Sequence, residues 1–352
     1  GAVLLHVLTH KGKGYEPAER HPARFHGAEP FDIETGLPKK PRTKANYTDI
    51  FSTVMIKMAQ RDERVVAITA AMPDGVGLKR FRNIYPDRFY DVGIAEQHAV
   101  TFAAGLAVGG LRPVVAVYSS FLQRGYDQIL HDVCLQNLPV IFAIDRAGLV
   151  GSDGETHQGI FDLSYLSSIP NMTVMAPKNK WELSDMMKFA LKLGTPVAIR
   201  YPRGQAYDGL EDYRQEISLG RSEWIFREEE VCLYAVGSMV KTAEAVREIL
   251  KEKGIPCSLV NARFVKPVDS DCITEIARSH ELLVTMEENV MQGGFGDSVR
   301  RVLDEVAPGK NLLQVALPDA YVEHGSVDLL KQHLGLDPES IAERIMSKIS
   351  ED

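Results

Sequence analysis

The sequence predicts an α/β protein in which a parallel-sheet domain is followed by a smaller α/β domain. Short apolar runs rich in β-branched residues alternate with segments of helical apolar spacing, first over residues 47–203 and again over 229–352. Most of the strand-like runs are apolar at consecutive positions, so both of their faces are expected to be buried. This pattern is typical of a parallel sheet covered by helices on both sides.

The elements of the first domain follow from these two patterns. The helices are expected to begin at Tyr47 and to span 76–85, 95–108, 120–137 and 180–193. The strands are expected at 64–70, 88–94, 112–119, 138–147, 171–177 and 196–202.

The same alternation predicts the second domain. Its strands are expected at 231–238, 257–264, 281–288 and 311–318. Its helices are expected at 239–254, 272–279, 295–306, 326–333 and 340–349.

Two polar, turn-rich segments without hydrophobic periodicity are predicted to be linkers, residues 11–46 and 204–228. Residues 1–10 form an apolar, strand-like run without a starting Met. We therefore expect residues 1–10 to be the last strand of a preceding domain, and the chain to be a piece of a longer protein.

Composition narrows the classes of partner. A net charge of -8 argues against nucleic acid as the main partner, because nucleic-acid binding calls for a basic surface. No apolar run reaches the roughly 18 residues that a membrane span needs. The four cysteines are dispersed without a CxxC pair, which favours free buried thiols and a cytoplasmic location.

Polar side chains follow the carboxyl ends of several predicted strands, where open α/β sheets bind ligands. The side chains are Glu96, Phe121, Arg124, Arg146, Asp153, His157 and Arg203. Because parallel strands end at one edge of a sheet, we expect these loops to converge on a single site. Glu96 stands out, since a buried carboxylate is costly unless it has a partner or a function.

Each of these residues also has a purely structural interpretation. Glu96 could favour a helix N-terminus, Asp153 could cap a turn, and the arginines could form surface ion pairs. His98 is more consistent with a structural role than with a catalytic one. The segment 153–157, "DGETH", lacks a third nearby metal ligand, and 293–298, "GGFGDS", lacks the spacing of a nucleotide loop and better fits tight helix packing.

Three stretches carry a specific resemblance: "DVGIAEQHAVTFAAGLA" at 91–107, "YSSFLQRGYDQILHD" at 118–132 and "IDRAGLVGSDGETHQGIFDLSYL" at 144–166. They resemble the 1-deoxy-D-xylulose-5-phosphate synthase family, as do "GKGYEPAE" and "RFHG" within 12–27. These thiamine-diphosphate enzymes join pyruvate to glyceraldehyde 3-phosphate in isoprenoid and thiamine biosynthesis. The resemblance extends over essentially the whole chain.

The resemblance implies the identity of the domains. Residues 47–203 would bind the cofactor's pyrimidine, and 229–352 would be the transketolase-type C-terminal domain. Residues 1–10 would end a diphosphate-binding domain whose GDG and ND motifs, which hold Mg²⁺, are not in this sequence. No metal ligand is therefore expected in this chain, and the chain alone is expected to bind thiamine diphosphate weakly.

The resemblance also implies roles for individual residues. Glu96 would hydrogen-bond N1′ of the aminopyrimidine, with burial favouring a carboxyl that carries a proton, and Phe121 would stack on that ring. His26 and His157 would handle protons around the C2 adduct, with Asp153 beside them. The group that grips the aldehyde's phosphate would be Tyr118, Arg146 and Arg203, and Arg124 would be a further active-site arginine.

The same resemblance implies a homodimer, with residues 97–108 and 120–137 as candidate interface helices. Without the preceding domain, residues 1–42 are expected to be poorly anchored, so that His26 need not face His157. Two alternatives remain: a 2-oxoacid dehydrogenase β-subunit or half of a split transketolase, and a dimeric core fragment that is inactive by itself.

Overall fold

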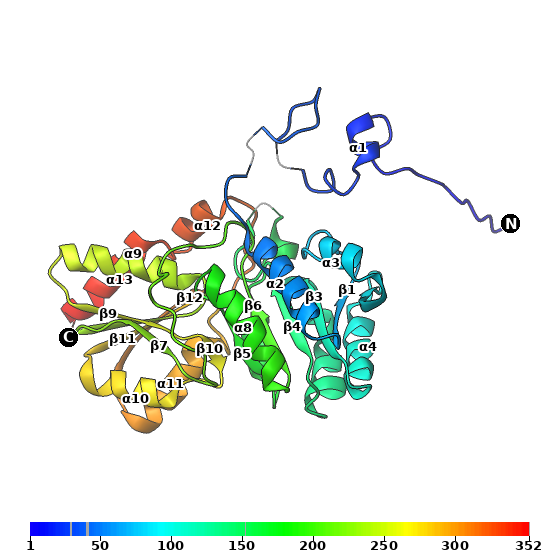
Figure 1. Ribbon diagram of the computed structural model, residues 1–352. Coiled ribbons are helices and arrows are strands. Elements are labelled where there is room, and N and C mark those ends of the chain that lie inside the picture. Colours follow the sequence, from blue (N-terminus) through cyan, green and yellow to red (C-terminus); the bar gives the residue numbers. More distant parts are fainter. Residues whose placement is uncertain (29, 40–41, 152, 352) are drawn as a thin grey trace. The chain divides into compact units, whose positions relative to one another are not determined.

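The computed structural model describes residues 1–28, 30–39, 42–151 and 153–351 of the chain (Figure 1). Residues 29, 40 and 41 of the predicted first linker, and Ser152 of the candidate active-site loop, lie outside the described residues. The chain forms two compact units, Gly1–Ala45 and Asn46–Asp352. All the predicted strands from residue 64 onward belong to the second unit.

The predicted parallel-sheet domain is confirmed, with one added strand. Across the described residues its sheet has seven strands in the order β10-β5-β6-β4-β3-β1-β2, parallel except for β10. The strands are β1 (Val65–Thr69), β2 (Phe89–Asp91), β3 (Arg112–Tyr118), β4 (Ile141–Asp145), β5 (Thr173–Met175), β6 (Val197–Arg200) and β10 (Phe264–Lys266).

Helices cover both faces of this sheet because its strands send alternate side chains to opposite sides. On β3, Val114 and Ala116 join the core under α2 (Tyr47–Arg61) and α8 (Lys180–Leu193). Val115 and Val117 join the core on the other face, under α4 (Glu96–Val108) and α7 (Asp162–Ser167). The short helix α3 (Lys79–Ile84) confirms the prediction over 76–85, whereas α7 was not predicted.

The prediction of one helix over 120–137 was wrong. The segment is broken into α5 (Ser119–Leu122), a 3₁₀ turn η2 (Gln123–Gly125), α6 (Tyr126–Gln128) and a π-helical stretch η3 (Ile129–Cys134). A Cβ added at Gly125 would lie 3.1 Å from Val100 Cγ2 and 3.6 Å from the Glu96 carbonyl oxygen. The glycine therefore lets the start of α4 approach closely, and a regular helix is interrupted there.

The second sheet confirms the predicted smaller domain. Across the described residues its order is β12-β11-β8-β9-β7, parallel except for β7. Its strands are β7 (Glu223–Phe226), β8 (Val231–Ala235), β9 (Cys257–Asn261), β11 (Leu282–Val290) and β12 (Asn311–Leu317). Its helices are α9 (Met239–Glu252), α10 (Ser270–Ser279), α11 (Phe295–Val306), α12 (Val327–His333) and α13 (Pro338–Glu351).

Two details of this domain correct the predictions. Strand β7 lies inside the segment 204–228, where only a linker was expected. The single strand expected at 257–264 is two strands in different sheets. The chain turns at Arg263, whose φ is 58°, so that β9 belongs to the second sheet and β10 pairs with β5 of the first.

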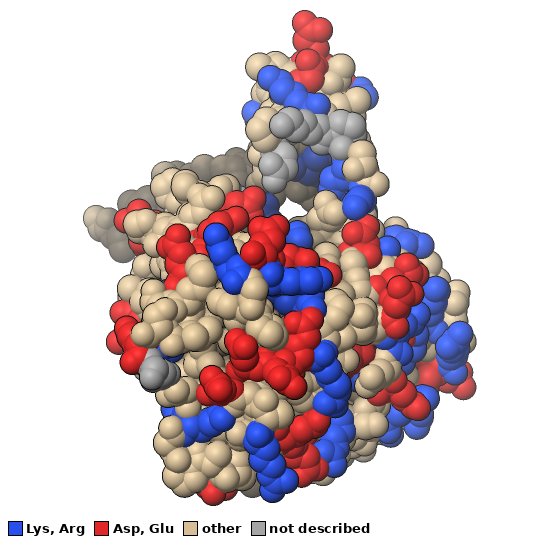
Figure 2. Space-filling view, turned by 90° about the vertical axis from the view of Figure 1, so that its left-hand side faces the viewer, with Lys and Arg blue, Asp and Glu red and all other residues tan. Residues whose placement is uncertain are grey.

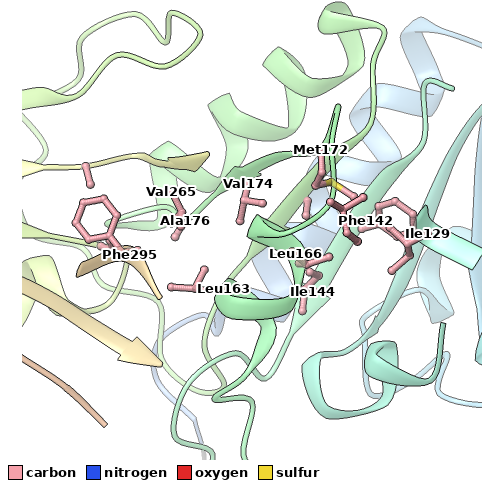
Figure 3. Close-up of a cluster of buried hydrophobic side chains, with 14 of the residues drawn as sticks. Ile129, Phe142, Ile144, Leu163, Leu166, Met172, Val174, Ala176, Val265 and Phe295 are labelled. Carbon is pink, nitrogen blue, oxygen red and sulfur yellow. The ribbon is translucent and has the colours of Figure 1, made fainter. Parts of the chain in front are cut away.

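A continuous apolar core joins the two sheets. Figure 3 shows it running from Ile129 and Phe142, through Val174 and Ala176, to Phe295 of α11. One of the buried apolar clusters is therefore common to the two sequence domains, which agrees with their forming one compact unit.

The first unit is small and built around aromatic rings. The Phe25 ring packs edge-on against Tyr15 at 5.5 Å and Phe31 at 5.0 Å, next to the short helix α1 (Glu16–Arg20). The predicted linker 11–46 thus has local structure. Residues 1–10 have no secondary structure and exposed side chains, because a strand needs a paired neighbour; their place in a further domain stays a prediction.

The face shown in Figure 2 carries interspersed acidic and basic side chains and no broad patch of one sign. Within the described ranges, no helix is both long enough and apolar enough to cross a bilayer.

A buried carboxylate occupies the start of α11. Glu287 of β11 is 1% exposed and accepts hydrogen bonds from the N–H groups of Phe295 and Gly296, both at 2.8 Å. Two N–H donors of the "GGFGDS" segment are therefore already used, which agrees with a packing role for that segment. Burial raises the Glu287 pKa to about 7, although the two backbone hydrogen bonds oppose the rise.

This pKa predicts a pH-dependent stability. Between the ordinary carboxyl pKa of 4.5 and about 7, the folded state holds a proton that the unfolded state releases, so stability should fall as pH rises through that window. Glu287→Gln should remove about 3 kcal/mol of this dependence in denaturation measured at pH 4.5 and 8. The control is Glu305→Gln, because Glu305 is exposed on α11, the helix whose first N–H groups bind Glu287. An unchanged pH slope in Glu287→Gln would contradict the assignment.

Candidate active site

Three neighbouring strands of the first sheet, β6, β4 and β3, end at one edge of the sheet. Tyr118 ends β3 and Asp145 ends β4, while Arg203 follows β6 by three residues. The glycine-rich loop at 146–160 leaves the same edge after β4. The candidate site lies where the carboxyl ends of these strands meet, as expected for a parallel α/β sheet.

Aromatic rings form one wall of the site. The rings of Tyr118 and Phe121 stack with centroids 5.6 Å apart, and His157 meets Phe121 edge-on at 5.2 Å. The Arg146 guanidinium lies 4.0 Å from the centre of the Tyr118 ring, a cation–π contact. Burial raises the pKa of Tyr118, so its hydroxyl is a hydrogen-bond donor at neutral pH. The structure thus brings four predicted site residues together.

Arg146 is held in place by a residue that the sequence analysis missed. Fully buried Asp145 accepts hydrogen bonds from Thr48 Oγ1 at 2.7 Å and from the Arg146 N–H at 2.8 Å, and pairs with Arg146 Nη1 at 3.0 Å. Burial raises the Asp145 pKa, and Arg146 opposes the rise. Arg146 also has a φ of 59° and donates to the Gly75 carbonyl at 2.7 Å. The sequence signal that could have identified Asp145 is a carboxylate at the end of an otherwise apolar strand, β4.

A second arginine lies in the same region. Arg203 Nη1 is 3.0 Å from Asp153 Oδ2, and both side chains are partly exposed, at 28% and 36%. The charges of Asp153 and Arg203 both act on Tyr118, which places this pair beside the aromatic wall. Asp153 therefore partly neutralises the charge of Arg203, and the guanidinium remains accessible to an anionic ligand.

Glu96 is the first residue of α4 and is 3% exposed. Its Oε2 atom is buried and makes no hydrogen bond with any described residue. The start of α4 packs on Gly125, four residues after Phe121. A buried carboxylate oxygen without a partner costs free energy, so Glu96 is expected to meet a ligand atom.

The remaining residues considered in the sequence analysis have other surroundings. Arg124 lies in η2, and its side chain is exposed. His26 belongs to the first unit, where its Nδ1 is 2.8 Å from Lys11 Nζ, and its role stays a prediction. His98 is exposed and stacks on Phe102 at 5.9 Å.

Metal-ligand groups and cysteines were both considered as parts of the site. No group of three or more His, Cys, Asp or Glu side chains in the described parts of the chain could hold a metal ion. All four cysteines are free and buried. Burial raises the pKa of Cys134, Cys257 and Cys272 to about 12, so these thiols are poor nucleophiles.

Comparison with known domain families defines the class of protein. Residues 43–208 match the pyrimidine-binding domain of transketolase, and residues 220–341 match the transketolase C-terminal domain. The chain is similar to one titled "Split gene transketolase, inactive beta4 tetramer", with a TM-score of 0.77 and 26% identity over 86% of this chain and 98% of that one. Fold and domains together define a transketolase-type protein.

Curated relatives identify the family within that class. The chain is 57% identical over 346 residues to 1-deoxy-D-xylulose-5-phosphate synthase of Lachnoclostridium phytofermentans, covering 98% of this chain and 55% of that protein. It is 50% identical over 351 residues to the synthase of Caldanaerobacter subterraneus, covering 100% and 56%. The chain belongs to the 1-deoxy-D-xylulose-5-phosphate synthase family and spans about half the length of these relatives.

Proposed function

We propose that this chain supplies the pyrimidine-binding half of an enzyme that condenses pyruvate with glyceraldehyde 3-phosphate to 1-deoxy-D-xylulose 5-phosphate and CO₂. The observation that carries the proposal is the buried Oε2 of Glu96, which has no hydrogen-bond partner among the described residues and lies near the segment that bears Phe121. The family, whose relatives are named for this activity, supports the same assignment.

The residues present fit the pyrimidine end of thiamine diphosphate. Glu96 Oε2 is an acceptor, or a donor when protonated, for a ring nitrogen, and the Phe121 ring can stack on a planar heterocycle. When bound, the cofactor supplies the carbanion chemistry at its C2 atom. The role of Glu96 is to hold and share a proton at the pyrimidine nitrogen. The diphosphate and Mg²⁺ would be held by the preceding domain.

The substrates would lie along the Tyr118 wall. Arg203 and Arg146 are the cations available there for the phosphate of glyceraldehyde 3-phosphate, because guanidinium forks match phosphate oxygens. His157 and Asp153 lie on the loop beside them and would handle protons on the substrates. We assign His26 and Arg124 to the same site only in the complete enzyme.

We further propose that the complete enzyme is a cytoplasmic homodimer in which the region of α4 and η3 contributes to the interface. The support is the exposed apolar side chains Val108, at the end of α4, and Leu135, next to η3, which are 68% and 69% exposed. The four unpaired thiols agree with a reducing compartment.

Replacing Arg203 by Ala in the complete enzyme should raise the KM for glyceraldehyde 3-phosphate roughly 10–150-fold, because one charge-assisted hydrogen bond is lost. The KM for pyruvate, which carries no phosphate, should change little. Arg203 is a cleaner test than Arg146, whose removal would leave Asp145 buried without its cation. Arg214→Ala, which removes an exposed pair with Asp185, is the control. Equal changes for both substrates would contradict the assignment.

The decisive experiment combines this chain with the diphosphate-binding half, thiamine diphosphate and magnesium. CO₂ release from pyruvate that depends on glyceraldehyde 3-phosphate supports the proposed function. CO₂ release without the aldehyde would favour a 2-oxoacid dehydrogenase β-subunit. No CO₂ release with or without the aldehyde would favour the remaining alternative, a dimeric core fragment that is inactive by itself; one similar chain is titled as an inactive β4 tetramer of a split-gene transketolase.

A further inference from the structure

The loop that bears Asp153 and His157 is anchored on the C-terminal domain. At its base, Gly148 and Gly159 exchange backbone hydrogen bonds at 2.6 and 2.8 Å. Leu149 and Ile160, next to these glycines, are buried in the core of the second sheet. The base of the loop is therefore fixed by the C-terminal domain, while the candidate catalytic residues lie further out.

The side chain of Gln158 links the outer part of this loop to the C-terminal domain. Gln158 is 2% exposed, and its Oε1 accepts a hydrogen bond from the Val150 N–H at 2.8 Å. Its Nε2 donates to the carbonyl oxygen of Glu323, in the segment before α12, at 3.1 Å. Both polar atoms of a buried amide are thus satisfied, one within the loop and one by the C-terminal domain.

The C-terminal segment 323–325 lies directly along the loop. The N–H of Gly325 donates to the Gly151 carbonyl at 3.4 Å, and a Cβ added at Gly151 would lie 2.7 Å from the Gly325 carbonyl oxygen. This contact holds Gly151, and the side-chain hydrogen bonds of Gln158 hold residue 158. His157, next to Gln158 in the chain, is consequently held with its ring edge-on to Phe121.

We propose that Gln158 is a positioning residue for the candidate active site. It locks the loop of Asp153 and His157 to segment 323–325, so the C-terminal domain sets the geometry of these two side chains although it contributes neither of them. The consequence for catalysis rests on the proposed function; the positioning itself concerns only this chain and can be measured without turnover.

The test is NMR of this chain with Gln158→Met, which keeps the side-chain length and removes both hydrogen bonds. The Val150 amide should exchange about 10-fold faster or more, because a buried partner is lost. The His157 ring resonances, assigned with His157→Gln, should lose the ring-current shift caused by Phe121. Unchanged Val150 exchange and unchanged His157 resonances would overturn the proposal.

A second variant keeps the test decisive if Gln158→Met does not fold. Gln158→Glu retains the acceptor for Val150, but its ionised carboxylate faces the Glu323 carbonyl oxygen and cannot donate. The His157 resonances should therefore shift at pH 8 and return towards their original position as the carboxyl is protonated at low pH. A displacement that does not depend on pH, beyond that of the unmodified chain, would overturn the role of the donated bond.

Two controls separate positioning from general perturbation. Glu323→Ala should leave the His157 resonances unchanged, because Gln158 uses the backbone carbonyl of Glu323 and not its exposed side chain. Gln136→Met tests the same substitution at an exposed site.

In the complete enzyme, Gln158→Met should lower kcat/KM for glyceraldehyde 3-phosphate about 10-fold. If the unmodified complete enzyme has no such activity, the proposed function fails, and the NMR result still decides the role of Gln158.

Discussion

Glu96→Ala should reduce turnover of the complete enzyme by roughly 10²–10⁴-fold, because that is the usual contribution of a positioned acid–base group. The loss should appear as slower exchange of the cofactor's C2 proton, measured by NMR, with a smaller effect on the KM of either substrate. Gln97→Ala, exposed beside it on α4, is the control. C2 exchange at the normal rate in Glu96→Ala would refute the role.

Glu96 also makes a prediction for the chain by itself. Since its Oε2 is buried and has no partner in the part of the chain that the structure describes, Glu96→Gln should not lower the free energy of unfolding and is expected to raise it. A residue that costs stability and is required for turnover fits a functional role rather than a structural one. A clear loss of stability would indicate that Glu96 is a helix-terminal residue, the structural alternative considered above.

Lys178→Met should destabilise the chain by about 3–5 kcal/mol, because it leaves two buried carboxylates with one buried cation, Arg263, in place of two. Lys178, 1% exposed, bonds Glu182 at 3.3 Å and Glu223 at 2.5 Å. Arg263 contacts the same two carboxylates, each at 2.7 Å. Burial disfavours ionised Glu182, but these cations outweigh it and hold its pKa below the usual range. The network joins α8 of one sequence domain to β7 of the other.

Urea denaturation of this chain provides the measurement. Lys188→Met, which removes a partly exposed pair with Asp185, is the matched control and should cost about 0–1 kcal/mol. Adding Glu223→Gln to Lys178→Met should restore part of the loss, since one buried charge is then removed with its partner. A cost in Lys178→Met no larger than in the control would contradict the importance of the network.

The sequence predicted regular elements well where local periodicity decides them. Helix α8 begins and ends at the predicted residues, 180 and 193, because its pattern is amphipathic and Gly194 follows it with a φ of 72°. The segment 120–137 also has an amphipathic pattern and is nevertheless broken. The cause is the close approach of α4 to Gly125, a tertiary contact that no local pattern contains.

The candidate site shows the same division. That strands end at one edge predicts that Phe121, Arg146 and His157 come together, and they do: His157 packs against Phe121, and both Phe121 and Arg146 contact Tyr118. The supports of these residues could not be predicted in the same way. Asp145 is noticeable only once its burial against Arg146 is known, and Gln158 only once its partner 165 residues away is known. Long-range hydrogen bonds leave no periodic trace in a sequence.

Strand β10 has a consequence for dividing this protein into parts. A shortened chain that ended at the first linker boundary, near residue 204, would contain the whole predicted pyrimidine-binding domain but would lack Phe264–Lys266. Strand β5 would then become an open edge with unpaired backbone groups, a known cause of aggregation. The contact of Phe264 with Phe189 of α8, at 6.0 Å between ring centres, would be lost as well. The smallest piece that preserves the first sheet therefore extends at least through Lys266, well inside the second sequence domain.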